Sequence, residues 1–215
     1  MRRFLSIALL AGLIASSLGA PATAARRKPI KMTYYLHGND VVGEAYLNTD
    51  GTYLAMNRKK PAGAEPKSIF VTNYVVGPNT ACSGNGLLPT WKGPLVGRVA
   101  GTVTVTLNTI STPATRLKVE IFPDGNGGCD GGSLGNTGYV PPAAARSVAV
   151  APGPGVTKVV FKNVRFKTLS HVILQLSIDP APAPVGPQQV RVLYDSTDFA
   201  SSIKLTCTPT RGKKC

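Results

Sequence analysis

The sequence is poor in acids and in histidine. Its 215 residues include 10 Asp or Glu against 24 Lys or Arg, and the two histidines are His37 and His171. Glu44, Glu65 and Glu120 are isolated from one another, which disfavours a site built on paired carboxylates. One serine, Ser133, stands in a G-x-S-x-G sequence at 131–135. That sequence lies within the glycine-rich segment 124–138, without the flanking strand and helix that the nucleophile turn of a serine hydrolase requires, so a serine-hydrolase site is not indicated. We expect no catalytic residues and no enzymatic activity, with a secreted hydrolase as the open alternative.

Long apolar runs are also scarce. The one such run, residues 4–20, follows Arg2 and Arg3 and precedes the small-residue triplet at 22–24, a pattern typical of an export signal. No later segment approaches the ~20 apolar residues of a membrane span. We expect residues 1–25 to be a signal peptide, with an uncleaved anchor as the alternative. The remaining chain is then secreted and possesses no transmembrane span, and it is either free outside the cell or associated with the cell envelope.

A helical periodicity is missing after the leader, and short alternating segments take its place. Residues 102–107 alternate Thr with Val or Leu, which puts Val103, Val105 and Leu107 on one face of a half-buried strand. Gly-rich and Pro-rich turns separate this segment from others of its kind. The segments expected as strands are 31–36, 41–47, 52–56, 67–76, 95–99, 102–107, 117–121, 148–151, 156–166, 172–178, 190–194 and 203–207.

These strand signals predict an all-β fold. About ten short strands with Gly/Pro turns and no repeat of fixed length indicate an antiparallel β-sandwich, with the jelly roll as the expected form. The Pro-rich segment 180–187 resembles a linker, but too few strands follow it to build a second domain. We therefore expect residues 26–215 to form a single β-sandwich domain.

Four cysteines, an even number, suit an exported chain with two disulfides. Three pairings are possible, and we favour Cys82 with Cys129 and Cys207 with Cys215. The first two lie in Gly-rich loops and the second two flank a short tail. A zinc site is the alternative, but the spacings fit none of the usual ligand pairs.

Positive charge is the most extreme property of the composition. Removal of Arg2 and Arg3 with the leader leaves 22 basic and 10 acidic residues, a net charge of +12. Such a protein favours anionic surroundings, whereas scattered charge only improves solubility. The basic residues gather in separate groups at 26–28, 58–60, 158–167 and 211–214. A surface that binds a polyanion requires such groups to converge in space.

Two loop regions, one near Cys82 and the other near Cys129, offer ligand-binding side chains. An exposed aromatic ring can stack on a sugar ring, and neighbouring amide side chains can form hydrogen bonds with the hydroxyl groups of the sugar. The alternative is that the single tryptophan of this β-sandwich is buried in its core. The proposed Cys82–Cys129 disulfide would bring the two loops together. The candidate glycan-binding residues are Trp91, Tyr139, Asn85 and Asn136.

Calcium is the one cofactor that the sequence suggests. Asp124, Asn126 and Asp130 offer oxygen ligands within the glycine-rich segment 124–138, and calcium prefers such hard ligands. The segment departs from the EF-hand loop because Gly135 stands at the twelfth position, where an acid is required. A disulfide-tethered glycine loop without metal is the alternative.

Three stretches carry a resemblance to a known class of domain. YYLHG (34–38), TACSGNGLLPTWKG (80–93) and VRVLYDSTDFASSIKLTC (190–207) resemble exported jelly-roll domains of bacteria and archaea. Such domains are grouped with galactose-binding-like modules and with accessory domains of secreted peptidases. The resemblance implies the fold and an exported location, and it assigns no binding residue.

We therefore expect a secreted, non-catalytic binding module associated with the cell envelope. Its expected partner is a glycan or an anionic wall polymer, and no specific nucleic acid. The alternatives are an accessory domain for a secreted protein partner, such as a protease, and the secreted hydrolase considered above.

Overall fold

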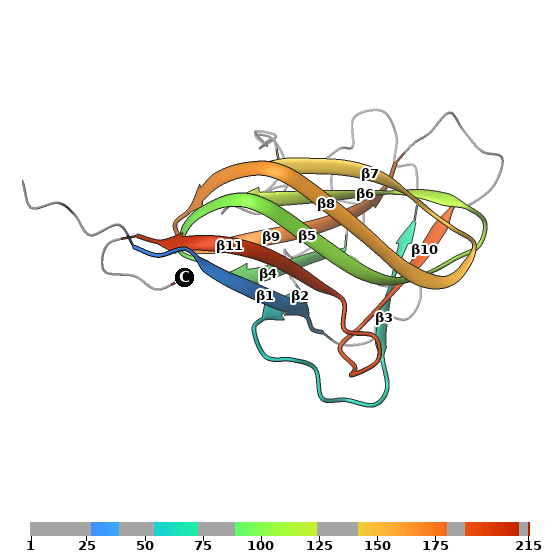
Figure 1. The fold of residues 1–215 in the computed structure, drawn as a ribbon. Coiled ribbons are helices and arrows are strands. Elements are labelled where there is room, and N and C mark those ends of the chain that lie inside the picture. The colour runs from blue at the N-terminus through green and yellow to red at the C-terminus, as the bar shows by residue number, and fades with distance from the viewer. Residues whose placement is uncertain (1–26, 39–53, 73–88, 124–141, 180–187, 211–214) are drawn as a thin grey trace, which may run out of the picture.

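The computed structural model describes residues 27–38, 54–72, 89–123, 142–179, 188–210 and 215. These residues form eleven strands and no helix (Figure 1), which confirms the predicted all-β class. The strands are β1 (Ile30–Leu36), β2 (Leu54–Asn57), β3 (Lys67–Thr72), β4 (Thr90–Pro94), β5 (Gly97–Ser111), β6 (Thr115–Pro123), β7 (Ala144–Val150), β8 (Gly153–Thr168), β9 (His171–Ile178), β10 (Gln189–Tyr194) and β11 (Ser202–Pro209).

The strands form two layers that face each other across one core. The front layer in Figure 1, which we call sheet A, contains β8, β5, β11 and β1, with β10 and β3 extending it beside β5. The second layer, sheet B, contains β4, β9, β6 and β7, and β2 connects it to β1. All pairs are antiparallel except β2 with β4, which is parallel. The predicted β-sandwich is thus confirmed, with one parallel pair added.

Strand β5 occupies the centre of sheet A because both of its edges are paired. Along one edge, β8 pairs with it from Gly97 to Ser111. Along the other edge, β11 pairs with its first part and β10 with its last part. The Ser201 side chain bridges β10 and β5 at the point where β11 gives way to β10. Its Oγ donates a hydrogen bond to the Leu193 carbonyl oxygen at 2.6 Å and accepts one from the Asn108 N–H at 2.9 Å.

The core follows the alternation that the sequence predicts. Val103, Val105 and Leu107 on β5 are completely buried, as are Leu117 and Val119 on β6. Each such side chain contributes about 1.5–3 kcal/mol when it is fully removed from water. The predicted segments 95–99 and 102–107 belong largely to the single strand β5. The predicted strand 41–47 lies outside the described residues.

The segment around Trp91, which the sequence analysis placed in a loop, is strand β4. It pairs antiparallel with β9 and parallel with β2, so its backbone hydrogen bonds lie in sheet B. Gly93 permits this close packing, because a Cβ atom there would lie 2.8 Å from the Met56 carbonyl oxygen. Glycine at this position thus serves packing inside a strand, and β4 ends at the following residue, Pro94.

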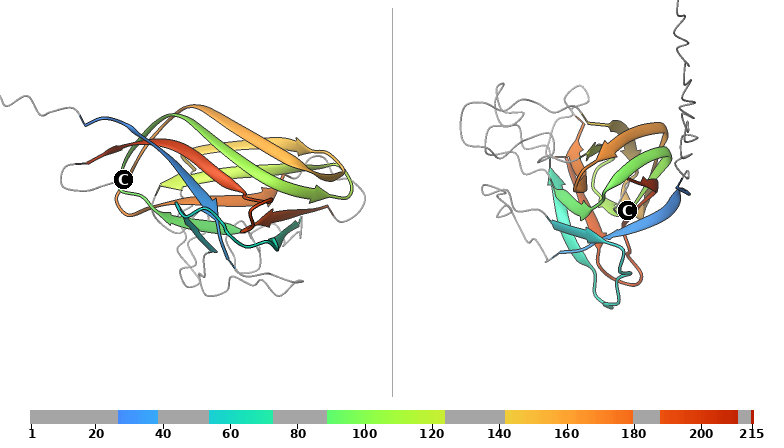
Figure 2. Two further views of the ribbon diagram at one scale, coloured as in Figure 1. Left: turned by 60° about the horizontal axis from the view of Figure 1, so that its bottom comes forward. Right: turned by 90° about the vertical axis from the view of Figure 1, so that its left-hand side faces the viewer.

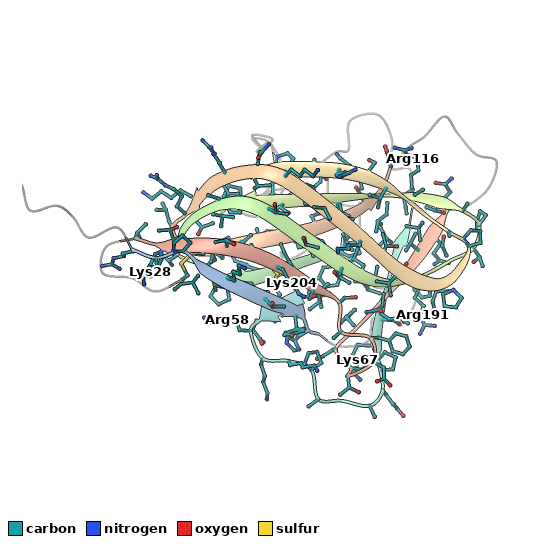
Figure 3. The ribbon with its side chains drawn as sticks, viewed as in Figure 1. Lys28, Arg58, Lys67, Arg116, Arg191 and Lys204 are labelled. Atoms are coloured by element: carbon teal, nitrogen blue, oxygen red, sulfur yellow. A yellow bond between two sulfur atoms is a disulfide. The ribbon has the colours of Figure 1, made fainter. Side chains whose placement is uncertain are left out.

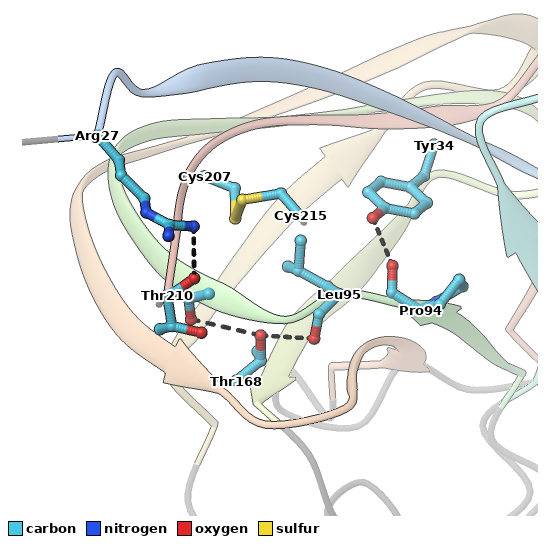
Figure 4. The surroundings of a disulfide bond; sticks show 9 residues. Arg27, Tyr34, Pro94, Leu95, Thr168, Cys207, Thr210 and Cys215 are labelled. Atoms are coloured by element: carbon cyan, nitrogen blue, oxygen red, sulfur yellow. Dashed lines mark hydrogen bonds between the residues drawn. A yellow bond between two sulfur atoms is a disulfide. The ribbon is translucent and has the colours of Figure 1, made fainter. Parts of the chain in front are cut away.

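The predicted disulfide between Cys207 and Cys215 is confirmed (Figure 4). It ties the end of the chain to β11 and packs against β5 at Gly97. The loop-entropy model gives it about 2.5 kcal/mol of stabilisation for a loop of this length. Nearby, the Arg27 guanidinium donates to the Thr210 carbonyl at 2.8 Å. Cys82 and Cys129 lie outside the described residues, and their disulfide stays a prediction.

The close contact at Gly97 leads to a test of this packing. A Cβ atom there would lie 2.6 Å from the Cys207 Sγ and 2.7 Å from the Thr208 carbonyl oxygen. We expect Gly97→Ala to lower the free energy of unfolding by about 1–3 kcal/mol, the usual cost of overpacking, in urea unfolding experiments. Gly155→Ala is the control, because a Cβ atom there meets nothing within 4 Å. Equal stabilities of the two variants would contradict the packing described.

Tyr34 links the two sheets through the core. Its side chain is buried, and its hydroxyl donates to the Pro94 carbonyl oxygen at 2.6 Å. Burial raises the pKa of Tyr34 to about 12, and the charge of Arg58 opposes this rise in part. The folded protein therefore holds Tyr34 in its neutral form at pH values where an exposed tyrosine has ionised.

The raised pKa of Tyr34 predicts a loss of stability in alkali. In the unfolded chain this hydroxyl ionises near its ordinary pKa of 10.0, so its contribution is complete below that pH. We expect the free energy of unfolding to fall as the pH rises from about 10 to about 12. Urea unfolding of Tyr34→Phe over the same range should lack this part of the decrease. Identical pH profiles for the two proteins would refute it.

Candidate functional site

One of the predicted glycan-binding residues lies in the described part of the chain, and it is buried. Trp91 is 0% exposed, and its ring packs edge to face with Tyr194 at a centroid distance of 5.5 Å. The prediction of an exposed Trp91 platform is therefore wrong, because β4 places this ring between the two sheets. Tyr139, Asn85 and Asn136 lie outside the described residues, as do the calcium candidates Asp124, Asn126 and Asp130.

His37, which precedes Gly38 after β1, forms a pair with Asp195, which follows β10. The His37 Nδ1 lies 2.6 Å from the Asp195 Oδ1, and its Nε2 lies 2.9 Å from the Lys59 carbonyl oxygen. The Gly38 N–H donates to the other Asp195 carboxylate oxygen at 3.4 Å. Asp195 itself has a φ of 61°, which a non-glycine residue adopts rarely. The pair thus holds together three segments that are distant in the sequence.

These contacts indicate a structural role for His37. Both ring nitrogens already have partners, so neither is free to accept a proton from a nucleophile. The segment that carries Asp195 is fixed by a further bond, from the Thr197 N–H to the Gly63 carbonyl at 2.9 Å. His171 lies elsewhere, at the start of β9, where its Nδ1 is 2.6 Å from the Ser170 Oγ at an exposed position. The contacts of His37 therefore do not favour its use as the base of a hydrolase.

Metal ligands do not gather in the described ranges, where no three His, Cys, Asp or Glu residues lie close enough to hold a metal ion. The same part of the chain contains no helix that is long and apolar enough to cross a membrane. The remaining candidate is a surface defined by charge.

The outer side of sheet A collects basic side chains from four strands. On β5, β8, β11 and β1 most apolar residues point into the core, and the residues between them point outward. Val156 and Val160 of β8 are exceptions on the outer side, where Val156 is 67% exposed. Figure 3 shows one of these side chains, Lys204, on the front of the sheet. We call this surface the cationic face; its basic residues, all exposed, are Lys31, Arg98, Lys158, Lys162, Arg165, Lys167 and Lys204.

Threonines lie between these charges. Thr33 on β1 and Thr104 on β5 both stand opposite Lys204, and Thr106 stands opposite Lys158. Each hydroxyl can donate and accept a hydrogen bond. The face therefore combines point charges with short polar groups on a rigid backbone.

Acidic residues are absent from all four strands of the cationic face. None of its seven basic side chains forms an ion pair with a carboxylate among the residues that the structure describes. Arg98 and Lys167 even stand directly opposite each other, an arrangement that destabilises a sheet. The positive charge of this face is thus not neutralised by described parts of the protein.

Sheet B differs, because two basic residues of its strand β6 are paired with carboxylates. The Lys118 Nζ lies 2.8 Å from the Glu120 Oε1, and the Arg116 Nε lies 3.4 Å from the Asp179 Oδ2. A hydrogen bond from Ser147 lowers the pKa of Asp179, with a further contribution from Arg116. The two outer surfaces of the sandwich are therefore electrostatically distinct.

Sequence reasoning missed the cationic face because its residues are spread from position 31 to position 204. The signal that could have revealed it is the side-chain alternation itself. Where inward positions of a strand are apolar, outward positions can be compared between strands, and here they contain basic residues and threonines without acids. The missing information was which strands are neighbours.

The burial of Trp91 predicts its spectroscopic behaviour. We expect the emission of this single tryptophan to be blue-shifted and protected from acrylamide in the folded protein, and to become red-shifted and quenchable in urea. Trp91→Ala should lower the free energy of unfolding by about 3–5 kcal/mol. Strong acrylamide quenching of the native protein would contradict this placement.

The similarity of this chain to known proteins supports its fold and does not indicate its function. No family model matches the sequence, and no curated protein matches it. Among solved structures, the chain is similar to part of an aminopeptidase from the marine sediment archaeon Thaumarchaeota archaeon, with a TM-score of 0.51 and 15% identity over 84% of this chain and 37% of that one. This likeness supports the β-sandwich, and the chain spans little more than a third of the aminopeptidase.

Two further likenesses have TM-scores below 0.5 and carry no argument. One is to an alpha-amino acid ester hydrolase, with a TM-score of 0.49 and 14% identity over 81% of this chain and 36% of that chain. The other is to the CBM36-1 domain of a multidomain xylanase from the hindgut metagenome of Trinervitermes trinervoides, with a TM-score of 0.29 and 12% identity over 65% of this chain and 96% of that chain.

Proposed function

We propose that the protein is an exported, non-catalytic module that binds an acidic glycan or another anionic wall polymer of the cell envelope. The observation that carries this proposal is the cationic face, on which seven exposed basic side chains share one side of a sheet without a described carboxylate partner. Neighbouring positive charges repel one another, and an anionic polymer would relieve that repulsion.

The dimensions of the face suit an extended polymer. Strand β8 has 16 residues, which corresponds to a length of about 50 Å. The four strands β8, β5, β11 and β1 lie about 4.8 Å apart, so the face is about 14 Å wide. A surface of this shape can contact several repeating anionic groups at once. Its rigid strands also lose little conformational entropy on binding.

The side chains of the face favour anionic groups over neutral sugars. Neutral sugars and single-stranded nucleic acids are commonly bound by stacking on exposed aromatic rings. Among the described outward positions of the four strands, the one aromatic residue is Tyr35 on β1, and it is half-buried. Lys and Arg with interleaved Thr instead supply charge and hydrogen bonds, which suit carboxylate, sulfate or phosphate groups along a hydroxyl-rich chain.

A second candidate is an accessory domain that binds a secreted protein partner. In the archaeal aminopeptidase, the similar fold occupies part of a longer chain. A domain of that kind would present its cationic face to an acidic protein surface. The two candidates differ in what they bind, so one experiment can separate them.

The test compares polygalacturonate, a polyanion, with neutral galactan at physiological salt, where unspecific attraction is screened. We expect saturable binding of the polyanion and none of the galactan. Lys167→Gln/Lys204→Gln should weaken binding about tenfold, because two contacts of about 0.7 kcal/mol each are lost. Removing Lys167 also relieves its repulsion with Arg98, so the melting temperature should not fall.

The matched control is Arg58→Gln/Lys60→Gln, which removes the same charge from exposed positions outside the cationic face. It should change the affinity less than twofold. Equal losses in the two double variants would show that only net charge matters, and would contradict the proposal. Binding of a secreted protein in place of any polymer would favour the accessory domain.

A further inference from the structure

The sandwich has a hollow where the edges of its two sheets meet. Strand β7 ends sheet B, β8 borders sheet A, and no backbone ladder joins them within the described residues (Figure 1). The hollow between them, which we call the seam hollow, has a volume of about 460 Å³. It is lined on one side by residues 143–146 and on the other by residues 160–165.

Local sequence explains why this space is open. Three consecutive alanines, Ala143 to Ala145, line one side and fill little volume. On the other side, β8 contains a bulge: Gly101 of β5 is opposite Val164 and Val103 is opposite Phe161, so β8 has one extra residue. Asn163 in this bulge has a φ of 57°, in the left-handed region.

The bulge also determines which side chains border the hollow. Lys162 and Arg165 are three positions apart, so in a regular strand they would point to opposite faces. The extra residue between them makes both exposed, while Phe161 and Val164 both point into the core. The cationic face therefore continues to the rim of the seam hollow through Lys162 and Arg165.

Arg146 on β7 supplies a third positive charge from the opposite side. Its Nη1 donates to the Val160 carbonyl oxygen at 2.7 Å, which fixes the guanidinium across the seam. A guanidinium has five N–H donors, so further donors remain after this bond. Among the described residues that line the hollow, none is acidic. Three cations thus surround a space with a backbone-anchored guanidinium on one wall.

We propose that the seam hollow is a subsite that binds one anionic group, a carboxylate, sulfate or phosphate, of the acidic polymer that the cationic face holds. This inference rests on the proposed function, and it assigns different roles to the two surfaces. The cationic face attracts the chain along its length. The seam hollow takes a single group in an open groove between β7 and β8, where the guanidinium groups of Arg146 and Arg165 can donate hydrogen bonds to the oxygens of one anion.

The test uses nuclear magnetic resonance of the ¹⁵N-labelled full chain, titrated separately with inorganic phosphate and with a galacturonate oligomer. Phosphate should cause saturable shifts confined to the amides of 143–146 and 160–165. The oligomer should shift these amides and, in addition, those around Lys158 and Lys204. Arg165→Gln should weaken phosphate binding at least fivefold, whereas Lys158→Gln, which removes the same charge outside the hollow, should change it less than twofold.

Arg146→Gln removes the hydrogen bond from Arg146 to the Val160 carbonyl oxygen and could destabilise the fold. The melting temperature of this variant must therefore be measured together with its affinity for phosphate. Arg165→Gln provides the independent variant, because no described bond depends on its guanidinium. Phosphate shifts that spread evenly over all exposed lysines, or equal losses in Arg165→Gln and Lys158→Gln, would overturn the subsite even if the polymer binds. Local phosphate binding without any oligomer binding would instead overturn the proposed function, and with it the role of the hollow as a polymer subsite.

Discussion

The register of β5 is the constraint on which the core and the surface both depend. Its inward residues, such as Val105, fill the space between the sheets, and its outward residues, such as Arg98, lie on the cationic face. A shift of one residue against β8 would exchange the two sets and bury charge. Burial of an unpaired charge is so unfavourable that the apolar alternation fixes the face as firmly as it fixes the core. Packing therefore positions the residues that we propose bind the polymer.

The alternation of apolar and polar residues in the sequence predicted the strands that have one buried and one more exposed side along their length. Strand β5 is the clearest case, because its alternation of buried and more exposed positions was readable from the sequence. Pairing of Cys207 with Cys215 was predictable as well, because only a short tail separates them. Strand β4 was not, since Gly93 and Pro94 are ordinary turn residues and only the proximity of Met56 explains the glycine. The need for glycine at position 93 comes from a tertiary contact, and the neighbouring sequence contains no signal of that contact.

Long-range pairs were the other part that the sequence could not reveal. His37 and Asp195 are 158 positions apart, and each alone resembles an ordinary turn residue. The basic residues of the cationic face looked like separate groups for the same reason: Lys31 and Lys204 lie on the paired strands β1 and β11, at opposite ends of the chain. The strand order brings basic residues that are far apart in the sequence onto one face of the sheet. Positive charge gathered on one face can bind an anionic polymer, whereas charge spread evenly over the surface only improves solubility.

The bulge in β8 shows how a local irregularity can serve both core and surface. Without the extra residue, Phe161 and Val164 could not both reach the core, and Lys162 and Arg165 could not both be exposed. Asn163 adopts a backbone conformation that costs about 1 kcal/mol or more for a residue other than glycine. Core packing explains why a bulge is tolerated, since two apolar side chains are buried in return. Core packing does not by itself explain why Lys162 and Arg165 flank the bulge beside Arg146 across the seam, and the anion binding that we propose would account for that arrangement.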